Sequence, residues 1–250
     1  MITEALILAG GKGTRLSKVL KGNPKPLVEI GGIPLLKHQI NLLLSHGVKK
    51  FYLLVNYKSN LIKNFLQKEF NHIDYQILDD GKKALGTGGS ILKHLHIFNK
   101  TFFVLYGDTF LNVNLDEFFN FHKQKLSDLT LFAHPNTHPF DSDVLICDSN
   151  EKVIDISGYP HDKSFYSSNL VNAALYVVEK KMLQEIPKIN KILIDFAKDI
   201  IPLYISKANV FAYKSREYIK DCGTEARLKK VESDFKDKRH LNLAHGSFHQ

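Results

Sequence analysis

The sequence predicts a doubly wound α/β fold with a mostly parallel central sheet, and three observations carry this prediction. Short apolar runs alternate with amphipathic stretches of helical period through the first half of the chain. A glycine-rich stretch directly follows the first apolar run. The chain has 250 residues, enough for one large core. Apolar runs joined by helices are typical of parallel sheets that are buried on both faces.

The strands expected in the first half are short and rich in β-branched or aromatic residues: Ala5–Leu8, Phe51–Val55, Tyr75–Leu78 and Thr101–Leu105. Helices are predicted between them over Pro34–Ser45 and Leu61–Phe70. Pro34 suits the first turn of its helix, and Gly47 suits the position after its end. In a sheet of this kind ligands bind at the carboxyl ends of the strands, where the glycine-rich stretch begins.

From Leu129 onward the pattern changes to strands joined by short polar turns, at Leu129–Ala133, Asp143–Cys147, Lys152–Ile156 and Val171–Val178. This part is therefore predicted to be mixed or antiparallel. A last helix is expected from Thr224, which would be its N-cap. We interpret the chain as one domain over residues 1–239, divided at about residue 128 and again at 223, with a flexible tail over 240–250.

Composition narrows the class of protein. Hydrophobic residues make up 44% of the chain and charged residues 24%, which is typical of a folded soluble protein. The sequence lacks an apolar run of the ~18 residues that a membrane span needs, and it does not start like a signal peptide. We therefore expect a cytoplasmic protein with no membrane partner, in which Cys147 and Cys222 stay reduced.

The net charge of +8 points to acidic partners. Lysines are scattered and often alternate with acids, as in residues 234–238, whereas nucleic-acid binders gather them on one face. No nucleic-acid partner is therefore predicted, although this class stays an alternative. We expect a minority of the basic residues to line a site for anionic small molecules.

The stretch Gly10-Gly11-Lys12-Gly13-Thr14-Arg15-Leu16, followed by Pro24-Lys25-Pro26, predicts a cradle for a triphosphate. Glycines permit positive φ, so backbone N–H groups can close around an anion. Arg15 adds a fork of donors and Lys25 a compact charge. The dinucleotide fingerprint is not matched, because Leu16 stands where its third glycine belongs, and the P-loop string is absent. An ordinary glycine-rich turn is the alternative.

Two aspartates lie at positions that favour a functional role for their carboxylates. Asp108 follows a buried strand in Tyr106-Gly107-Asp108-Thr109, where it either serves a ligand or caps the next element. Asp221 precedes the last helix in Asp221-Cys222-Gly223-Thr224, and Thr224 already supplies the cap. Carboxylates are the ligands that Mg²⁺ prefers in proteins, usually one or two together with phosphates.

These segments resemble the motifs of the sugar-1-phosphate nucleotidyltransferases. The family has a G-G-x-G-T-R-L loop, a Pro-Lys-Pro segment, an L-G-T-G-G segment as at 85–89, an N-A-G-x-Y strand similar to residues 172–176, and a D-x-G-T segment as at 221–224. The resemblance covers about residues 4–230. It implies a Rossmann-like fold of the nucleotide-diphospho-sugar transferase type, with a nucleotide-binding part up to about 128 and a sugar-binding part over 129–223.

The resemblance also implies roles for individual residues. Arg15, Lys25 and Asp108 would be catalytic, and Asp108 and Asp221 would bind Mg²⁺ as the cofactor. The nucleotide would be bound by Leu8, Ala9, Gly10, Gly11, Gly13, Thr14, Arg15, Gly86, Thr87 and Gly88. Asn172 would bind the sugar. The family's Glu-Lys-Pro lysine is missing at residues 157–160, and Lys163 is the substitute that we expect.

The expected reaction joins a nucleoside triphosphate to a sugar 1-phosphate and releases pyrophosphate. Within the family the motifs most resemble the D-glycero-α-D-manno-heptose 1-phosphate guanylyltransferases, so GTP is the favoured nucleotide and GDP-heptose for lipopolysaccharide or capsule the favoured product. Mannose 1-phosphate guanylyltransferases and amino-sugar 1-phosphate uridylyltransferases share most of the motifs. A non-catalytic regulatory homologue and a dinucleotide-binding oxidoreductase are further alternatives, and the oligomeric state stays open.

Overall fold

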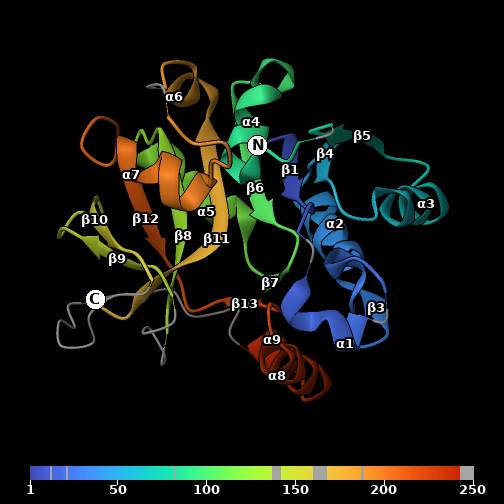
Figure 1. Cartoon of the computed structure of the whole chain (residues 1–250). Coiled ribbons are helices and arrows are strands. Elements are labelled where there is room, and N and C mark those ends of the chain that lie inside the picture. Colours follow the sequence, from blue (N-terminus) through green and yellow to red (C-terminus); the bar gives the residue numbers. More distant parts are fainter. Residues whose placement is uncertain are drawn as a thin grey trace. The chain divides into compact units, whose positions relative to one another are not determined.

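The computed structural model describes residues 1–11, 13–20, 22–81, 83–136, 142–159, 168–186 and 189–242 (Figure 1). The chain folds into two compact units. The first unit holds Met1–Ala84, Val104–Leu115 and the carboxyl-terminal segment from Glu217, and the second holds Leu85–Phe103 and Asp116–Arg216. Strand β6, Thr101–Tyr106, contributes residues to both.

The sheet of the first unit is parallel, as predicted. Strand β1, Glu4–Leu8, pairs with β4, Lys50–Val55, and β4 pairs with β5, Asp74–Asp79. Every residue of β1 is buried, because the run Glu-Ala-Leu-Ile-Leu has almost no polar side chain to expose. The predicted strands are confirmed with shifts of one residue at their ends. The expected α/β fold class is confirmed as well.

Two amphipathic helices of the first unit follow the predicted ranges closely. Helix α2 spans Leu35–Ser45 and begins directly after Pro34. Gly47, with φ of +79°, lies just beyond its end, as a left-handed residue after a helix should. Helix α3 spans Ser59–Glu69, two residues before the expected start.

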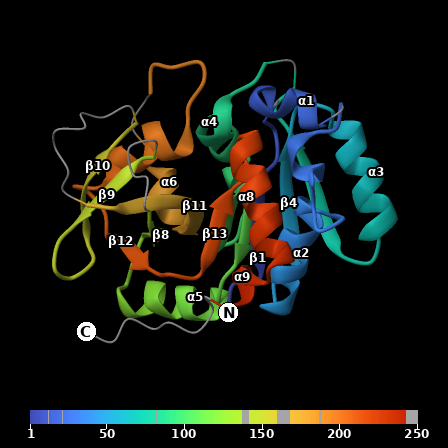
Figure 2. The ribbon, with the colours of Figure 1, turned by 90° about the horizontal axis from the view of Figure 1, so that it is seen from below.

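The remaining elements of the first unit are short, apart from the last long helix. They are η1 Thr14–Leu16, α1 Ser17–Leu20, η2 Lys25–Leu27, β2 Glu29–Ile30, β3 Ile33–Pro34, β7 Thr109–Asn112, β13 Tyr218–Asp221, α8 Glu225–Lys236 and α9 Arg239–Asn242. Strands β7 and β13 form an antiparallel pair, and α8 contacts β13 (Figure 2). The Oγ1 atom of Thr224 accepts a hydrogen bond from Arg227 N at 3.3 Å, so the predicted N-cap is confirmed.

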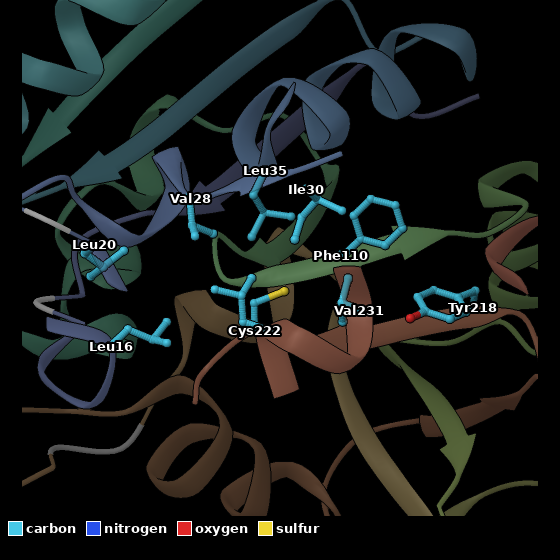
Figure 3. Close-up of a cluster of buried hydrophobic side chains, with 10 residues drawn as sticks. Leu16, Leu20, Val28, Ile30, Leu35, Phe110, Tyr218, Cys222 and Val231 are labelled. Atoms are coloured by element: carbon cyan, nitrogen blue, oxygen red, sulfur yellow. The ribbon is translucent and has the colours of Figure 1, made fainter. Parts of the chain in front are cut away.

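A buried apolar cluster joins these short elements (Figure 3). Its members come from the segment after β1, from β2, β7 and β13, and from α2 and α8: Leu16, Leu20, Val28, Ile30, Leu35, Phe110, Tyr218, Cys222, Leu228 and Val231. Full burial of one such side chain contributes about 1.5–3 kcal/mol. The cluster therefore holds together segments that are too short to be stable alone.

The described structure continues past residue 240, where the expected tail begins. Residues 239–242 form α9, and the ring of His240 stacks on that of Phe235 with centroids 4.6 Å apart. The Nδ2 atom of Asn112 donates to the His240 carbonyl at 2.9 Å. The flexible tail over 240–250 stays a prediction. Residues 243–250 lie outside the described part.

The second unit is mixed, as predicted for the second half. Its elements are α4 Gly86–Lys93, η3 Leu95–Ile97, α5 Leu115–Gln124, β8 Leu129–Pro135, β9 Val144–Cys147, β10 Val153–Ser157, β11 Leu170–Glu179, α6 Lys180–Gln184, a π-helical turn η5 Phe196–Ile200, α7 Ile201–Tyr204 and β12 Val210–Lys214. Strand β8 runs antiparallel to β11 and parallel to β12, whereas β9 and β10 form a hairpin with a turn at residues 149–150.

Strand β11 contains an irregularity between Asn172 and Tyr176, where its register with β8 shifts. Ala174 has φ of +59° at this point, and its N–H donates to Asn172 Oδ1 at 3.2 Å. A left-handed conformation costs an L-residue about 1–2 kcal/mol and costs glycine almost nothing. The family motif that resembles this segment has glycine here.

We expect Ala174→Gly to stabilise the protein by about 1 kcal/mol, because relief of the positive φ exceeds the extra backbone entropy of glycine. In a chain of this size that corresponds to a rise in melting temperature of about 2–4 °C. Thermal unfolding followed by circular dichroism measures the change. Ala173→Gly is the matched control and is expected to lower the melting temperature. A lower melting temperature for Ala174→Gly would contradict this explanation of the bulge.

Both cysteines are free thiols in the structure. Burial raises the pKa of Cys147 to about 11. Within the described ranges, no helix has the length and apolar character that crossing a bilayer requires.

Candidate active site

The glycine-rich loop leaves the carboxyl end of β1 and is held against β4 by a hydrogen bond from Ala9 N to Leu54 O of 2.8 Å. Gly13 has φ of +62°. A Cβ atom on Gly13 would lie 2.8 Å from Leu20 Cδ1 and 3.3 Å from Lys25 Cβ. Glycine is therefore required here for two reasons, the backbone conformation and the close approach of the lysine.

Lys25 begins the short turn η2, between Pro24 and Pro26. The two prolines restrict the backbone on either side, and Val28 N donates to Lys25 O at 3.1 Å. Only 8% of Lys25 is exposed. A buried ammonium needs a partner, and Lys25 Nζ forms an ion pair with Asp108 Oδ2.

Asp108 occupies the turn between β6 and β7. Gly107 N donates to Leu8 O at 3.0 Å, and a Cβ atom on Gly107 would lie 3.1 Å from the same oxygen. Glycine thus brings the turn against the end of β1. The carboxylate is directed to Lys25 and is not the cap of a helix, because β7 follows at Thr109.

The sequence did not predict a role for Gln39, which donates hydrogen bonds to the backbone of this turn. Gln39 lies on the buried face of α2, and its Nε2 donates to Tyr106 O at 2.9 Å and to Thr109 O at 2.8 Å. One amide group thus clamps both ends of the turn that carries Asp108. The signal was a polar residue at an apolar position of the helical pattern, but the sequence does not reveal its partners.

We expect Gln39→Leu to lower the free energy of unfolding by about 2–4 kcal/mol, because the two carbonyl oxygens lose the donor that they share. Activity should fall as well, since the turn carrying Asp108 loosens. Urea unfolding and a rate assay measure the two effects. Asn41→Leu, at an exposed position of the same helix, is the matched control, with an expected change within about 0.5 kcal/mol. Equal stability of the two variants would contradict the clamp.

Asp221 is brought beside this turn by the pairing of β13 with β7. In that register Asp221 lies opposite Thr109, and Cys222 N donates to Asp108 O at 2.7 Å. Asp221 Oδ1 accepts from Gly223 N at 2.9 Å. Arg227 Nη1 lies 2.9 Å from Oδ1 and 2.8 Å from Oδ2 of the same carboxylate. Two acids far apart in sequence therefore share one end of a two-stranded sheet.

Gly223 lies at the centre of this group of charged residues. A Cβ atom on Gly223 would lie 2.7 Å from Asp221 Oδ1, 3.4 Å from Lys25 Nζ and 3.8 Å from Arg15 Nη2. The structure thus brings Arg15, Lys25, Asp108 and Asp221 together in the first unit, and their roles stay predictions. Gly223 was not among the predicted site residues, although its place in the D-x-G-T segment was visible.

The thiol of Cys222 reports the electrostatics of this group. Cys222 is fully buried, and burial is the main reason why its pKa rises to about 12. The negative charges of Asp108 and Asp221 raise it further, whereas Lys25 lowers it. The charges of both carboxylates therefore affect the same thiol group. Because its pKa is high, this thiol stays protonated and unreactive at neutral pH.

The segment Gly86–Gly89 belongs to the second unit and is the first turn of α4. The reason is the chain at Ile194, whose carbonyl oxygen accepts from Gly88 N at 2.8 Å and Gly89 N at 3.2 Å. A Cβ atom on Gly86 would overlap that carbonyl. Thr87 Oγ1 donates to Asp195 Oδ2 at 3.0 Å. The N–H of Gly88, one of the residues predicted to bind the nucleotide, is thus already used.

Asn172 lies in β11 of the second unit, where its N–H donates to Asp143 O at 3.1 Å. Asp143 Oδ1 accepts from Tyr159 N at 2.8 Å, so Asp143 connects β11 with the segment after β10. The predicted sugar ligand Lys163 lies outside the described residues. Among the residues that are described, no three His, Cys, Asp or Glu side chains come close enough to hold a metal on their own.

Comparisons with known proteins give consistent results. Residues 4–238 match the protein family described as Nucleotidyl transferase. The chain is 32% identical over 184 residues to D-glycero-alpha-D-manno-heptose 1-phosphate guanylyltransferase of Campylobacter jejuni, covering 73% of this chain and 78% of that protein. It is 29% identical over 224 residues to mannose-1-phosphate guanylyltransferase catalytic subunit beta of Danio rerio, covering 88% of this chain and 61% of that protein.

A crystal structure of HddC from Yersinia pseudotuberculosis is similar along its whole length. The TM-score is 0.78 at 26% sequence identity, and the similarity covers 94% of this chain and 100% of that one. A second structure of the same protein, complexed with GMP-PN, has a TM-score of 0.76.

Proposed function

We propose that this chain, which belongs to the nucleotidyl transferase family and is a sugar-1-phosphate nucleotidyltransferase, has a specific pair of substrates. It transfers GMP from GTP to D-glycero-α-D-manno-heptose 1-phosphate. In this reaction an oxygen of the sugar phosphate forms a bond to the α-phosphorus of GTP. The bond from that phosphorus to the bridging oxygen breaks, and pyrophosphate leaves. The product is GDP-heptose, a precursor for surface polysaccharide.

One observation carries the proposal: Arg15, Lys25 and Asp221 surround Gly223, and Asp108 pairs with Lys25. The attacking phosphate oxygen is already anionic at neutral pH, because the second pKa of a phosphate monoester is about 6. Transfer therefore needs alignment and charge neutralisation rather than a general base. Lys25 would contact the α-phosphate, and Arg15 with the amides of residues 8–14 would hold the leaving pyrophosphate.

Asp108 and Asp221 are the residues that would hold Mg²⁺. Two carboxylates at one end of the β7–β13 pair fit an ion that takes its other ligands from phosphates and water. The ion would neutralise charge on the phosphates as the bond breaks. Lys25 pairs with Asp108 and Arg227 pairs with Asp221, so each carboxylate is oriented by a cation of the protein.

The choice of guanine and heptose rests on the relatives. The Campylobacter jejuni protein is named for both, and GMP-PN is bound in one structure of HddC. Gly86, Thr87 and Gly88 would contribute to nucleotide binding, with Thr87 fixed by Asp195. Asn172 would bind the sugar and Lys163 its phosphate, in place of the family's missing lysine.

The proposal is tested by measuring kcat/KM for pyrophosphate release with four nucleoside triphosphates and four sugar 1-phosphates: heptose, mannose, glucose and N-acetylglucosamine 1-phosphate. We expect GTP with D-glycero-α-D-manno-heptose 1-phosphate to have the highest value. The Danio rerio relative makes mannose 1-phosphate the second candidate. A higher value for any other pair would contradict the assigned substrates and would leave the enzyme class unaffected.

A further inference from the structure

Each of the two acids at the candidate active site is already paired with a cation of the protein. Asp108 pairs with Lys25, and Asp221 receives Arg227 Nη1 on both of its oxygens, at 2.9 and 2.8 Å. The two pairs differ in exposure. The side chains of Lys25 and Asp108 are 11% and 28% exposed, whereas those of Arg227 and Asp221 are 34% and 41% exposed. Asp221 is thus the acid that a dissolved cation reaches more easily.

The backbone around Arg227 is anchored independently of this ion pair. Thr224 Oγ1 accepts from Arg227 N at 3.3 Å, and Leu228, the next residue, is 5% exposed in the apolar cluster. On the other side, Gly223 N holds Asp221 Oδ1 at 2.9 Å. The carboxylate and the first turn of α8 would therefore keep their places if the guanidinium moved away. Only side-chain rotation of Arg227 is needed to free Asp221.

An ion pair that is this exposed contributes little to stability, because water screens it and two side chains must be held in one geometry. A divalent cation attracts a carboxylate more strongly than a guanidinium does, because its charge is doubled and compact. Arg227 Nη1 and a metal ion cannot both occupy the position between the two oxygens of Asp221. The two cations must therefore compete.

We propose that Arg227 is the resting counter-ion of Asp221 and that a divalent cation binds Asp221 only by displacing it. Arg227 would keep the carboxylate oriented while the site holds no metal, at the expense of metal affinity. The inference rests on the proposed function in one respect, since it takes Asp221 to be a metal ligand.

The test is Mn²⁺ binding to the full chain without nucleotide or sugar, measured from the electron paramagnetic resonance signal of free Mn²⁺. We expect Arg227→Gln to bind Mn²⁺ about three- to tenfold more tightly than the natural chain, because the weak competing pair is gone. Lys229→Gln is the matched control: Lys229 lies on the same helix, is 75% exposed and pairs with Glu225 at 2.7 Å. It removes the same charge and should leave Mn²⁺ affinity unchanged.

Equal or weaker binding by Arg227→Gln would overturn the inference, and so would an equal gain in Lys229→Gln, which would indicate net charge alone. Asp221→Asn separates this failure from a failure of the proposed metal site. If Asp221→Asn abolishes binding while Arg227→Gln leaves it unchanged, the metal site stands and the competition falls. If Mn²⁺ binds none of these proteins, both fall. Thermal unfolding gives an independent measure: Mn²⁺ should raise the melting temperature of Arg227→Gln more than that of the natural chain.

Discussion

Asp108→Asn is expected to lower the Mg²⁺-dependent release of pyrophosphate by at least about 10³-fold while the protein stays folded. Asparagine keeps the size of the side chain but removes the charge that pairs with Lys25 and that would hold the metal. Loss of charge neutralisation at the transferring phosphate is worth several kcal/mol, and each 1.36 kcal/mol is about tenfold in rate. Lys25, which is 8% exposed, would lose its partner, so the free energy of unfolding should fall by about 1–3 kcal/mol.

A coupled assay for pyrophosphate measures the rate, and circular dichroism confirms the fold. Asp237→Asn is the control, because Asp237 pairs with Arg239 at 2.6 Å on the exposed end of α8. It should keep the rate of the natural chain. Full activity of Asp108→Asn would remove Asp108 from the mechanism.

Lys25→Met is expected to reduce kcat/KM by about 10²–10³-fold, the usual loss when one preorganised group that stabilises the transition state is removed. Methionine keeps most of the apolar stem that packs near Gly13. The charge beside Asp108 and Gly223 disappears. Lys25→Arg should also be impaired, since Lys25 is only 8% exposed and pairs with Asp108, and a planar guanidinium is larger than an ammonium.

Steady-state kinetics with both substrates varied gives the loss. Lys229→Met, at a residue with a 75% exposed side chain, is the control for a general effect of charge. Less than a tenfold loss in Lys25→Met, together with normal activity in Lys25→Arg, would assign Lys25 to the stability of the turn rather than to the reaction.

The parallel part of the fold could be predicted because β1 and β4 are apolar along almost their whole length. Apolar runs of this length are typical of strands in a buried parallel sheet, as β1 and β4 are. The glycine motif was equally informative, since Gly13 needs a positive φ and leaves no room for a Cβ atom. Local patterns of this kind depend only on neighbouring residues, so they can be read from one sequence.

The parts that escaped prediction depend on pairings between distant residues. The β7–β13 pair, which sets Asp221 opposite Thr109, has strands of four residues with no distinctive period. The helical start at Gly86 depends on the chain at Ile194, and the position of His240 depends on its hydrogen bond with Asn112. In each case the role of a residue depends on a partner elsewhere in the chain, and the local sequence pattern does not identify that partner.

Arg227 and Gln39 illustrate the same limit at the site itself. Arg227 belongs to a helix of alternating charge, Glu-Ala-Arg-Leu-Lys-Lys, in which any basic residue would be assigned to solvent. Only the fold shows that this one reaches Asp221. Gln39 differs from its neighbours by being polar, yet its two carbonyl partners come from another segment.

The reaction that we assign to the residues around Gly223 is the transfer of a nucleotide to a sugar 1-phosphate. The most direct measurement uses GTP labelled on its α-phosphate, with Mg²⁺ and D-glycero-α-D-manno-heptose 1-phosphate, and follows the label by chromatography. We expect the label to appear in a nucleotide-sugar, one unlabelled pyrophosphate to be released for each product molecule, and neither to form without the sugar phosphate. Tight binding of the triphosphate with no labelled product, for any of the four triphosphates paired with any of the four sugar 1-phosphates, would contradict it.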